Sequence, residues 1–239
     1  MAELIPLALV PGLLCDAALW RAQAEALSDI ADCRVVDVMT HDSTVEMAGA
    51  VLEMMPGRFA IAGFSLGGFV AFEVIRRAPQ RVGLLALLGT RARLDAPEAT
   101  ARRRALIARA EKGDFEGVIQ QLLKVCIHQE RQNDAALVRE LTAMMDRCGP
   151  EVFVRQQAAI MGRADGLSTL AEIACPTLVL GGRQDALSPL EHQEEMAHGI
   201  ADADLVVVEE CGHFAPMERP EAVTAALRDW LAKWRAAPA

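Results

Sequence analysis

The sequence predicts an α/β fold, in which a mostly parallel sheet of about six strands carries helices on both faces. Two observations predict it. Short apolar runs alternate with amphipathic stretches of helical length, and the runs lack the alternating polar residues of a strand with one wet face. The chain has 239 residues, 52% of them hydrophobic, which is enough for one such domain with an insertion.

The strands and helices of this fold are expected in alternating order along the chain. The expected strands, each buried on both faces, are Leu4–Val10, Cys33–Val38, Phe59–Phe64, Val82–Gly89, Pro176–Gly182 and Ala203–Glu209. The expected helices between and after them are Ala17–Ser28, Thr44–Met55, Leu66–Ala78, which Pro79 ends, and a last helix that begins at Pro220.

The alternation breaks between about Asp95 and Ile173, where no strand-like run occurs. Four amphipathic stretches are expected to be helices there: Pro97–Lys112, Phe115–His128, Asn133–Arg147 and Glu151–Met161. The sequence therefore predicts a core of residues 1–94 and 174–239, with residues 95–173 inserted as a helical unit.

Charge and cysteine usage exclude several classes of partner. The formal net charge of −9 argues against nucleic acid or an anionic membrane surface, and no apolar run approaches the roughly 20 residues that span a bilayer. The six cysteines are scattered, without the spacing of zinc ligands, so we expect reduced, buried thiols and no metal site. The N-terminal stretch lacks a basic leader, and we expect a cytoplasmic protein.

One serine lies in an unusual setting. Gly63-Phe64-Ser65-Leu66-Gly67 matches G-x-S-x-G directly between an expected strand and an expected helix. In such a tight turn the serine side chain projects above the strand ends, and the flanking glycines let neighbouring backbone approach closely. Ser65 is therefore the candidate nucleophile; the alternative is an exposed serine in a glycine-rich turn without chemistry.

A serine hydroxyl needs a base, and His213 is the best placed of the five histidines. It follows the last expected strand, and catalytic groups of parallel sheets collect at the carboxyl ends of strands. Asp185 follows the fifth expected strand, in "LVLGGRQDALSP", where it could orient the imidazole. The order Ser65, Asp185, His213 is the one found in this architecture, although each could instead be an ordinary turn residue.

Two backbone N–H groups could hold a developing oxyanion. Leu66 follows the serine at the start of a helix, and Leu13 follows Pro11-Gly12 at the end of the first expected strand. We expect these two residues to be the oxyanion donors.

The segments "VPGLLCDAALW", "IAGFSLGGFVAFEV", "PTLVLGGRQDALSP" and "GHFAPMERPEAV" together resemble the α/β-hydrolase superfamily. The chain is most similar to small cofactor-free members: pimeloyl-ester carboxylesterases, 3-oxoadipate enol-lactonases and haloperoxidase-like enzymes. The resemblance implies that the inserted helices form a lid. It also implies that Ser65 is the nucleophile, His213 the general base and acid, Asp185 the orienting carboxylate, and Leu13 and Leu66 the oxyanion donors.

The expected activity is hydrolysis of a small-molecule ester or lactone through an acyl-enzyme, without cofactor or metal. Apolar residues near the serine and in the insertion favour an apolar acyl group, and the expected substrate contacts are Leu14, Phe64, Met144 and Met145. Lactonase, acyltransferase, carbon–carbon hydrolase and perhydrolase activities with the same three residues stay open, as do a non-catalytic ligand-binding role and a homo-oligomer.

The chain departs from its relatives in two loops. It has Pro11-Gly12 where most relatives have His-Gly, and "VDVMTHDST" replaces a glycine-rich loop that often lines the pocket. The substrate is therefore expected to differ from theirs.

Overall fold

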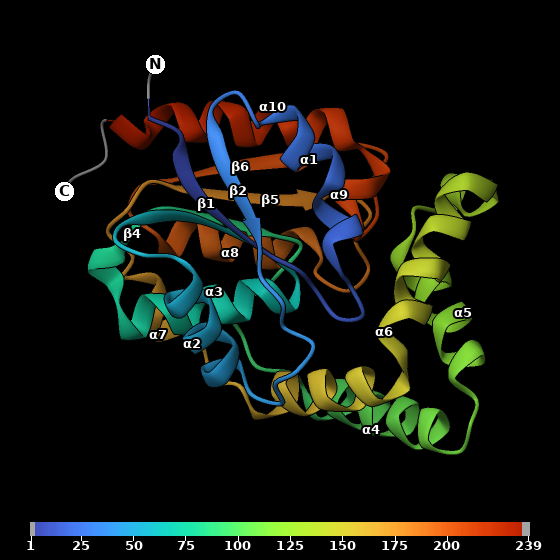
Figure 1. Cartoon of the computed structure of the whole chain (residues 1–239). Helices are drawn as coiled ribbons and strands as arrows, with labels where there is room; N and C mark the ends of the chain where they lie inside the picture. The colour runs from blue at the N-terminus through green and yellow to red at the C-terminus, as the bar shows by residue number, and fades with distance from the viewer. Residues whose placement is uncertain (1–2, 236–239) are drawn as a thin grey trace.

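The computed structural model describes residues 3–235 and contains one six-stranded sheet with helices on both faces (Figure 1). All neighbouring strands are parallel, in the order β2-β1-β3-β4-β5-β6. The strands are β1 (Ile5–Val10), β2 (Ala31–Val35), β3 (Phe59–Phe64), β4 (Val82–Leu88), β5 (Thr177–Gly182) and β6 (Ala203–Val208). The predicted parallel sheet is thus confirmed.

Helices from both ends of the chain cover one face of the sheet, and helices from its middle cover the other (Figure 1). The first group is α1 (Arg21–Ala26), α9 (Ala215–Glu218) and α10 (Pro220–Leu231). The second group is α2 (Thr44–Met54), α3 (Leu66–Arg77), α7 (Leu167–Leu170) and α8 (Leu190–Gly199).

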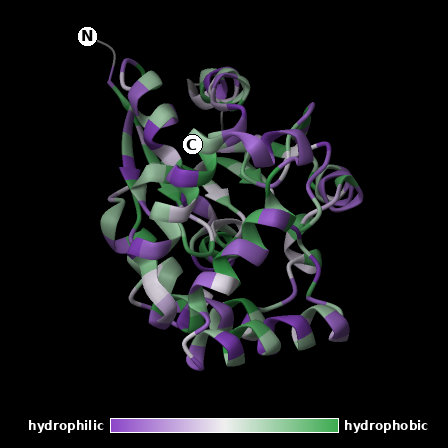
Figure 2. Ribbon diagram, turned by 90° about the vertical axis from the view of Figure 1, so that its right-hand side faces the viewer, coloured by the Kyte–Doolittle hydropathy of each residue, from purple (hydrophilic) through white to green (hydrophobic). Residues whose placement is uncertain are grey.

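The hydrophobic core has two parts, one on each face, because successive side chains of a strand point to opposite sides. In β1, Leu7 and Leu9 belong to the part that includes α10, whereas Ala8 and Val10 belong to the part that includes α3. In Figure 2 the strands inside are mostly hydrophobic, whereas the surrounding helices mix hydrophilic and hydrophobic residues.

Four α-helices lie between β4 and β5, where the sequence predicts a helical insertion. Three of them, α4 (Pro97–Glu111), α5 (Phe115–Cys126) and α6 (Ala135–Gly162), lie beside the sheet at the lower right of Figure 1, and the fourth is the short α7. The predicted break between Arg147 and Glu151 is a bend within α6, where Gly149 adopts φ 82° and ψ 170°. Proline after this residue also disfavours a straight helix.

Two predictions about the edge strands were wrong. The second strand was expected at Cys33–Val38, but β2 begins at Ala31, which pairs with Ile5, and ends at Val35. Burial on both faces also fails for β2 and β6, which keep half-buried and exposed residues. Both lie at the edges of the sheet, where one side has no neighbouring strand and polar side chains reach solvent.

The strand order places a crevice at the carboxyl ends of β1 and β3. From β1 the chain moves outward to β2, whereas from β3 it moves in the opposite direction to β4. Ligands bind in α/β sheets at such switch points, because the loops that leave the two strands diverge there. The Pro11–Leu14 segment follows β1 and Ser65 follows β3, so both lie at this crevice.

Candidate active site

Ser65 occupies the single-residue turn between β3 and α3. Its backbone has φ 53° and ψ −110°, a conformation that non-glycine residues seldom adopt. The Ser65 N–H donates to the Leu88 carbonyl on β4 at 2.8 Å, and the Thr90 hydroxyl donates to the Ser65 carbonyl at 2.9 Å. These bonds from a neighbouring strand and loop hold the strained turn.

The glycines around Ser65 are required by close backbone approach. A Cβ on Gly63 would collide with the backbone of Gly67, and a Cβ on Gly67 would collide with the carbonyl of Val10. The turn therefore packs directly on β1, and any side chain at these two positions would push α3 away from the sheet.

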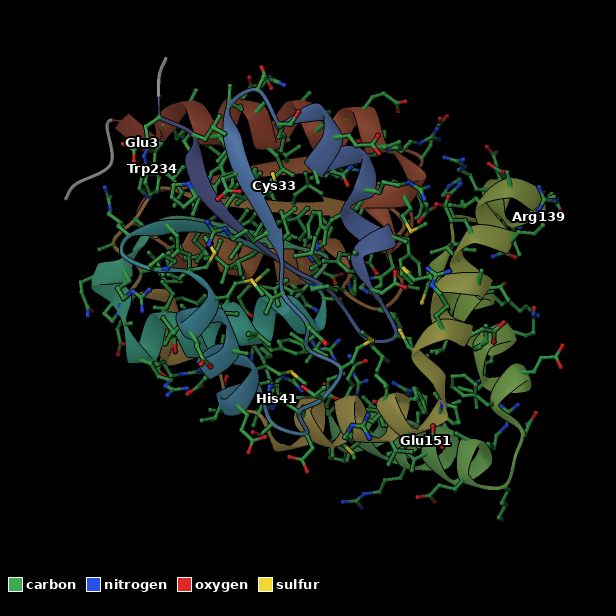
Figure 3. The ribbon with its side chains drawn as sticks, in the orientation of Figure 1. Glu3, Cys33, His41, Arg139, Glu151 and Trp234 are labelled. Carbon is green, nitrogen blue, oxygen red and sulfur yellow. The ribbon has the colours of Figure 1, made fainter. Side chains whose placement is uncertain are left out.

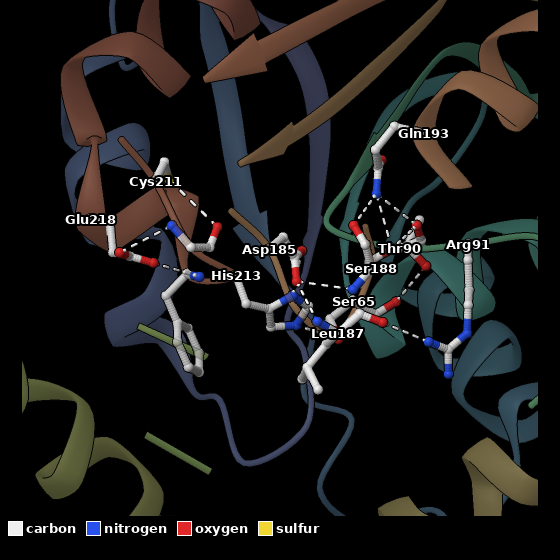
Figure 4. Close-up of polar contacts among 12 residues, drawn as sticks. Ser65, Thr90, Arg91, Asp185, Leu187, Ser188, Gln193, Cys211, His213 and Glu218 are labelled. Atoms are coloured by element: carbon white, nitrogen blue, oxygen red, sulfur yellow. Dashed lines mark hydrogen bonds and ion pairs between the residues drawn. The ribbon is translucent and has the colours of Figure 1, made fainter. Parts of the chain in front are cut away.

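His213 and Asp185 converge on Ser65 from two other loops (Figure 4). His213 Nε2 is 3.0 Å from Ser65 Oγ, and His213 Nδ1 is 2.7 Å from Asp185 Oδ2. With Nδ1–H donating to the carboxylate, Nε2 is left to accept the Ser65 hydroxyl proton. Asp185 and His213 are 3% and 4% exposed, so their contact is shielded from water.

The Asp185 carboxylate is fixed by its own loop. Its Oδ1 accepts hydrogen bonds from the N–H groups of Leu187 and Ser188, at 2.8 and 2.9 Å. The Ser188 hydroxyl donates to the Thr90 carbonyl, and Gln193 Nε2 donates to the same carbonyl at 3.0 Å (Figure 4). The loops after β4 and β5 are therefore tied together beneath the candidate site.

The other four histidines lie elsewhere. His41 follows β2, with Nδ1 3.8 Å from Glu46 (Figure 3), and His192 and His198 lie on α8. The prediction that His128 lies in a helix was wrong: α5 ends at Cys126, and the residue has ψ 137°. Among the histidines, all within residues 3–235, His213 alone contacts the Ser65 hydroxyl.

The two expected oxyanion donors lie on either side of the crevice. Leu66 is the first residue of α3, and Leu13 lines the cavity beside Ser65. Within residues 3–235 neither backbone N–H donates to a protein acceptor. The next residue, Leu14, has φ 56° and donates its N–H to Gln156 Oε1 of α6 at 2.8 Å, which fixes this loop against the insertion.

A cavity of about 400 Å³ opens onto Ser65 and His213, between the strand ends and α4, α5 and α6. Of the four expected substrate contacts, Phe64 and Met145 line it. Leu14 and Met144 do not; both are fully buried in the hydrophobic core. Leu14 is turned away by its left-handed backbone, and Met144 precedes Met145 on α6, where successive side chains point about 100° apart.

Glu218 is a candidate functional residue that the sequence did not indicate. Its fully buried carboxylate accepts hydrogen bonds from the backbone N–H groups of Gly212 at 3.2 Å and Phe214 at 3.0 Å, on either side of His213 (Figure 4). It also accepts one from the His128 N–H at 2.9 Å. The His213 N–H itself donates to the Cys126 carbonyl at 2.6 Å. The histidine loop is thus joined to the end of α5. Backbone donors leave no trace in a sequence, so no signal pointed to this residue.

Two buried thiols lie near the candidate site. Burial raises the pKa of Cys126 and of Cys211 well above the usual range, and the charges of Glu218 and Asp185 add to the shift. At neutral pH both thiols are protonated, so neither is a thiolate nucleophile that competes with Ser65. Cys33, on the edge strand β2, is half-buried rather than buried as expected.

Among residues 3–235, no group of three or more histidine, cysteine, aspartate or glutamate side chains is arranged to bind a metal ion. Over the same part of the chain, no helix has the length and apolar composition needed to cross a membrane.

Comparison with known proteins agrees with this architecture. The model of the alpha/beta hydrolase family matches residues 8–226. A pimeloyl-acyl-carrier protein methyl ester esterase of Neisseria meningitidis is 29% identical over 189 residues, which cover 77% of this chain and 73% of the relative.

Solved structures give the same result. A thermophilic esterase from Thermogutta terrifontis, solved with malate bound, is 31% identical, with a TM-score of 0.88 over 96% of this chain and 90% of that one. The enol-lactonase from Burkholderia xenovorans LB400 has a TM-score of 0.87 over 97% of this chain and 92% of its own, at 22% identity, and shows the fold alone.

Proposed function

We propose that this chain, which belongs to the alpha/beta hydrolase family, hydrolyses carboxylic esters with Ser65 as nucleophile. The observation that carries the proposal is the pair of contacts from Ser65 Oγ to His213 Nε2 and from His213 Nδ1 to Asp185 Oδ2, at 3.0 and 2.7 Å. Two relatives named as esterases support an ester as the bond that is cleaved.

In the first step, Ser65 Oγ attacks the ester carbonyl carbon while His213 Nε2 takes the hydroxyl proton. The carbon–oxygen bond to the alcohol then breaks, and the imidazolium returns that proton to the departing alkoxide. Asp185 stays ionised, keeps the imidazole oriented and stabilises its positive charge. The products of this step are a free alcohol and an acyl group bound to Ser65.

In the second step, His213 removes a proton from water, and the resulting hydroxide attacks the acyl carbon. The bond to Ser65 Oγ breaks, and the serine takes the proton back from His213 as the carboxylic acid leaves. The same imidazole thus acts as base and as acid in both steps.

The oxyanion of each tetrahedral intermediate is held by the backbone N–H groups of Leu13 and Leu66. Both donors are free of protein acceptors within the described residues, and Leu66 lies at the N-terminus of α3, where the helix dipole favours negative charge. The loss of one such donor typically costs about 100-fold or more in rate. Since both are backbone groups, loop geometry rather than side-chain identity positions them.

The inserted helices serve as a lid over the substrate. We assign residues 95–173 to this lid and residues 1–94 and 174–239 to the core. Leu106, Leu122 and Met145 line the cavity from three different lid helices, and Phe64 and Phe214 line it from the core. These walls fit an apolar acyl chain.

The test is the substitution Ser65→Ala, with p-nitrophenyl butyrate as substrate and a fluorophosphonate probe. We expect hydrolysis to fall by about 1000-fold or more, with the circular dichroism spectrum unchanged and no probe bound. Ser28→Ala, at an exposed serine in the loop after α1, serves as the matched control and should keep full activity. Retained activity or labelling in Ser65→Ala would overturn the proposal.

A further inference from the structure

The cavity at Ser65 has a basic wall. Arg91, from the loop after β4, and Arg102 and Arg103, from α4, line the same cavity as Ser65 and His213. The chain has 33 acidic and 24 basic residues, so clustered arginines at this place do not follow from its overall charge. Most of the remaining cavity surface is apolar.

One carboxylate serves this wall. Asp95 is 2.5 Å from both Arg91 Nη2 and Arg103 Nε, and 2.9 Å from Nη2 of the buried Arg163. The guanidinium groups of Arg91, Arg103 and Arg163 thus share a single carboxylate, which leaves an excess of positive charge. The exposed Arg102 adds to this excess. Burial alone would raise the pKa of Asp95, but the hydrogen bond from Arg103 and the three positive charges hold it far below the usual range. Asp95 is therefore fully ionised at neutral pH and has no further charge to offer.

Several guanidinium donors of these arginines have no protein acceptor among the described residues. Arg91 Nε is buried without an acceptor, while its Nη1 donates to the Leu187 carbonyl at 2.7 Å. Arg103 donates from Nε to Asp95 and from Nη1 to Gln157 at 2.8 Å, which leaves Nη2 unused among the described residues. Over the same residues, Arg102 forms no ion pair or hydrogen bond. A ligand anion in the cavity would satisfy donors that the protein leaves open.

We propose that Arg91, Arg102 and Arg103 form a subsite for a carboxylate, so that the preferred substrate is an ester with a second, ionised carboxyl group. This inference rests on the proposed ester hydrolysis at Ser65 and names its substrate class. A carboxylate is planar and matches the fork of a guanidinium group, and the cavity gives it apolar surroundings in which ion pairs are weakly screened. The apolar walls hold the chain that links the carboxylate to the ester.

The experiment compares matched esters. The first series contains monomethyl esters of dicarboxylic acids from glutaric to suberic acid, and the second contains methyl alkanoates of equal length. A third series carries the carboxylate on the alcohol side. Acid release in a pH-stat gives the ratio of kcat/KM for charged over neutral esters. We expect this ratio to exceed one by about 10- to 100-fold in at least one charged series, the usual gain from hydrogen bonds to a charged group.

The variants Arg102→Gln and Arg103→Gln should lower that ratio by about tenfold. Arg104→Gln, at an exposed arginine on the same helix but outside the cavity, should leave it as in the wild type. Should Arg103→Gln fail to fold because it loses its bond to Asp95, the wild-type protein still gives an answer. Added salt should lower the ratio, and glutarate or suberate should inhibit hydrolysis of a neutral ester more strongly than butanoate does.

The outcomes separate the two proposals. The carboxylate subsite would be overturned, and ester hydrolysis left intact, by two results together. The enzyme would hydrolyse neutral esters with no preference for charged ones, and the ratio of kcat/KM for charged over neutral esters would be the same in all three arginine variants. No hydrolysis of any series, with Ser65 unlabelled by the fluorophosphonate, would overturn both.

Discussion

Glu218→Gln provides a sharp test of how the histidine loop is held. The native carboxylate accepts from the N–H groups of His128, Gly212 and Phe214 at 2.9, 3.2 and 3.0 Å. Glutamine has nearly the same shape, but only one of its two terminal atoms accepts hydrogen bonds. Its oxygen can keep the two donors now shared by Oε2, and its amide nitrogen then faces the Phe214 N–H.

The expected loss of stability follows from these contacts. A hydrogen bond to a charged group contributes about 1.5–3 kcal/mol, and a buried donor without an acceptor costs about 1–3 kcal/mol. These two energies overlap, because both describe the loss of the same hydrogen bond at the Phe214 N–H. We therefore expect the free energy of unfolding to fall by about 3 kcal/mol.

The variant should also affect catalysis, because two of the three donors flank His213. A displacement of about 1 Å in a catalytic group can cost about 100-fold in rate. We expect kcat to fall by about 10- to 100-fold with KM nearly unchanged, and the fluorophosphonate to label Ser65 more slowly. Urea unfolding monitored by circular dichroism gives the stability, and ester hydrolysis gives kcat and KM.

Glu221→Gln is the matched control, since Glu221 is exposed in the first turn of α10 and should tolerate the change within about 0.5 kcal/mol. If Glu218→Gln were as stable and as active as Glu221→Gln, the reasoning would be refuted. If it were less stable with an unchanged kcat, Glu218 would support the fold without positioning the imidazole.

Three further predictions concern the candidate site and its supports. Asp185→Asn should lower kcat by about 10⁴-fold in ester hydrolysis, because the amide no longer holds the productive tautomer of His213. Asp95→Asn should be less stable than the wild type at pH 7 in urea unfolding. The folded-state pKa of Asp95 is lowered, so its ionised carboxylate contributes fully to the free energy of unfolding at pH values above its usual pKa of about 3.8. This contribution is lost as the pH falls below that value. The difference in stability between the wild type and Asp95→Asn should therefore shrink in acid. Gly67→Ala should yield little folded protein on expression, because its Cβ would collide with the Val10 carbonyl.

Each of these predictions has an opposing result. Gly162→Ala is the control for the glycine, since no atom lies within 4 Å of the added Cβ, and equal yields of the two variants would contradict the packing argument. A stability difference for Asp95→Asn that stays constant from pH 7 into acid would show that ionisation of Asp95 does not contribute. Wild-type kcat in Asp185→Asn would remove Asp185 from the mechanism.

The sequence by itself determined the parallel sheet, the helical stretch between β4 and β5 and the order of the candidate residues. These features are local: an apolar run of strand length, a proline after a helix, and a glycine on either side of Ser65 each restrict the backbone within a few residues. Because the carboxyl ends of parallel strands all lie at the same end of the sheet, the sequence also predicts that Ser65, Asp185 and His213 lie there together.

Only the tertiary structure decided which side chains meet across long distances in the chain. Glu218 accepts a hydrogen bond from His128, 90 residues away, and Arg163 pairs with Asp95, 68 residues away. Leu14 and Met144 are apolar, as cavity-lining residues often are, yet both are buried in the core. The left-handed backbone of Leu14 and the position of Met144 on its helix account for this. Such contacts depend on how the helices and strands pack against one another. Packing decides which backbone groups a buried side chain meets, which arginines share one carboxylate, and which way a side chain points. The local pattern of residues does not encode it.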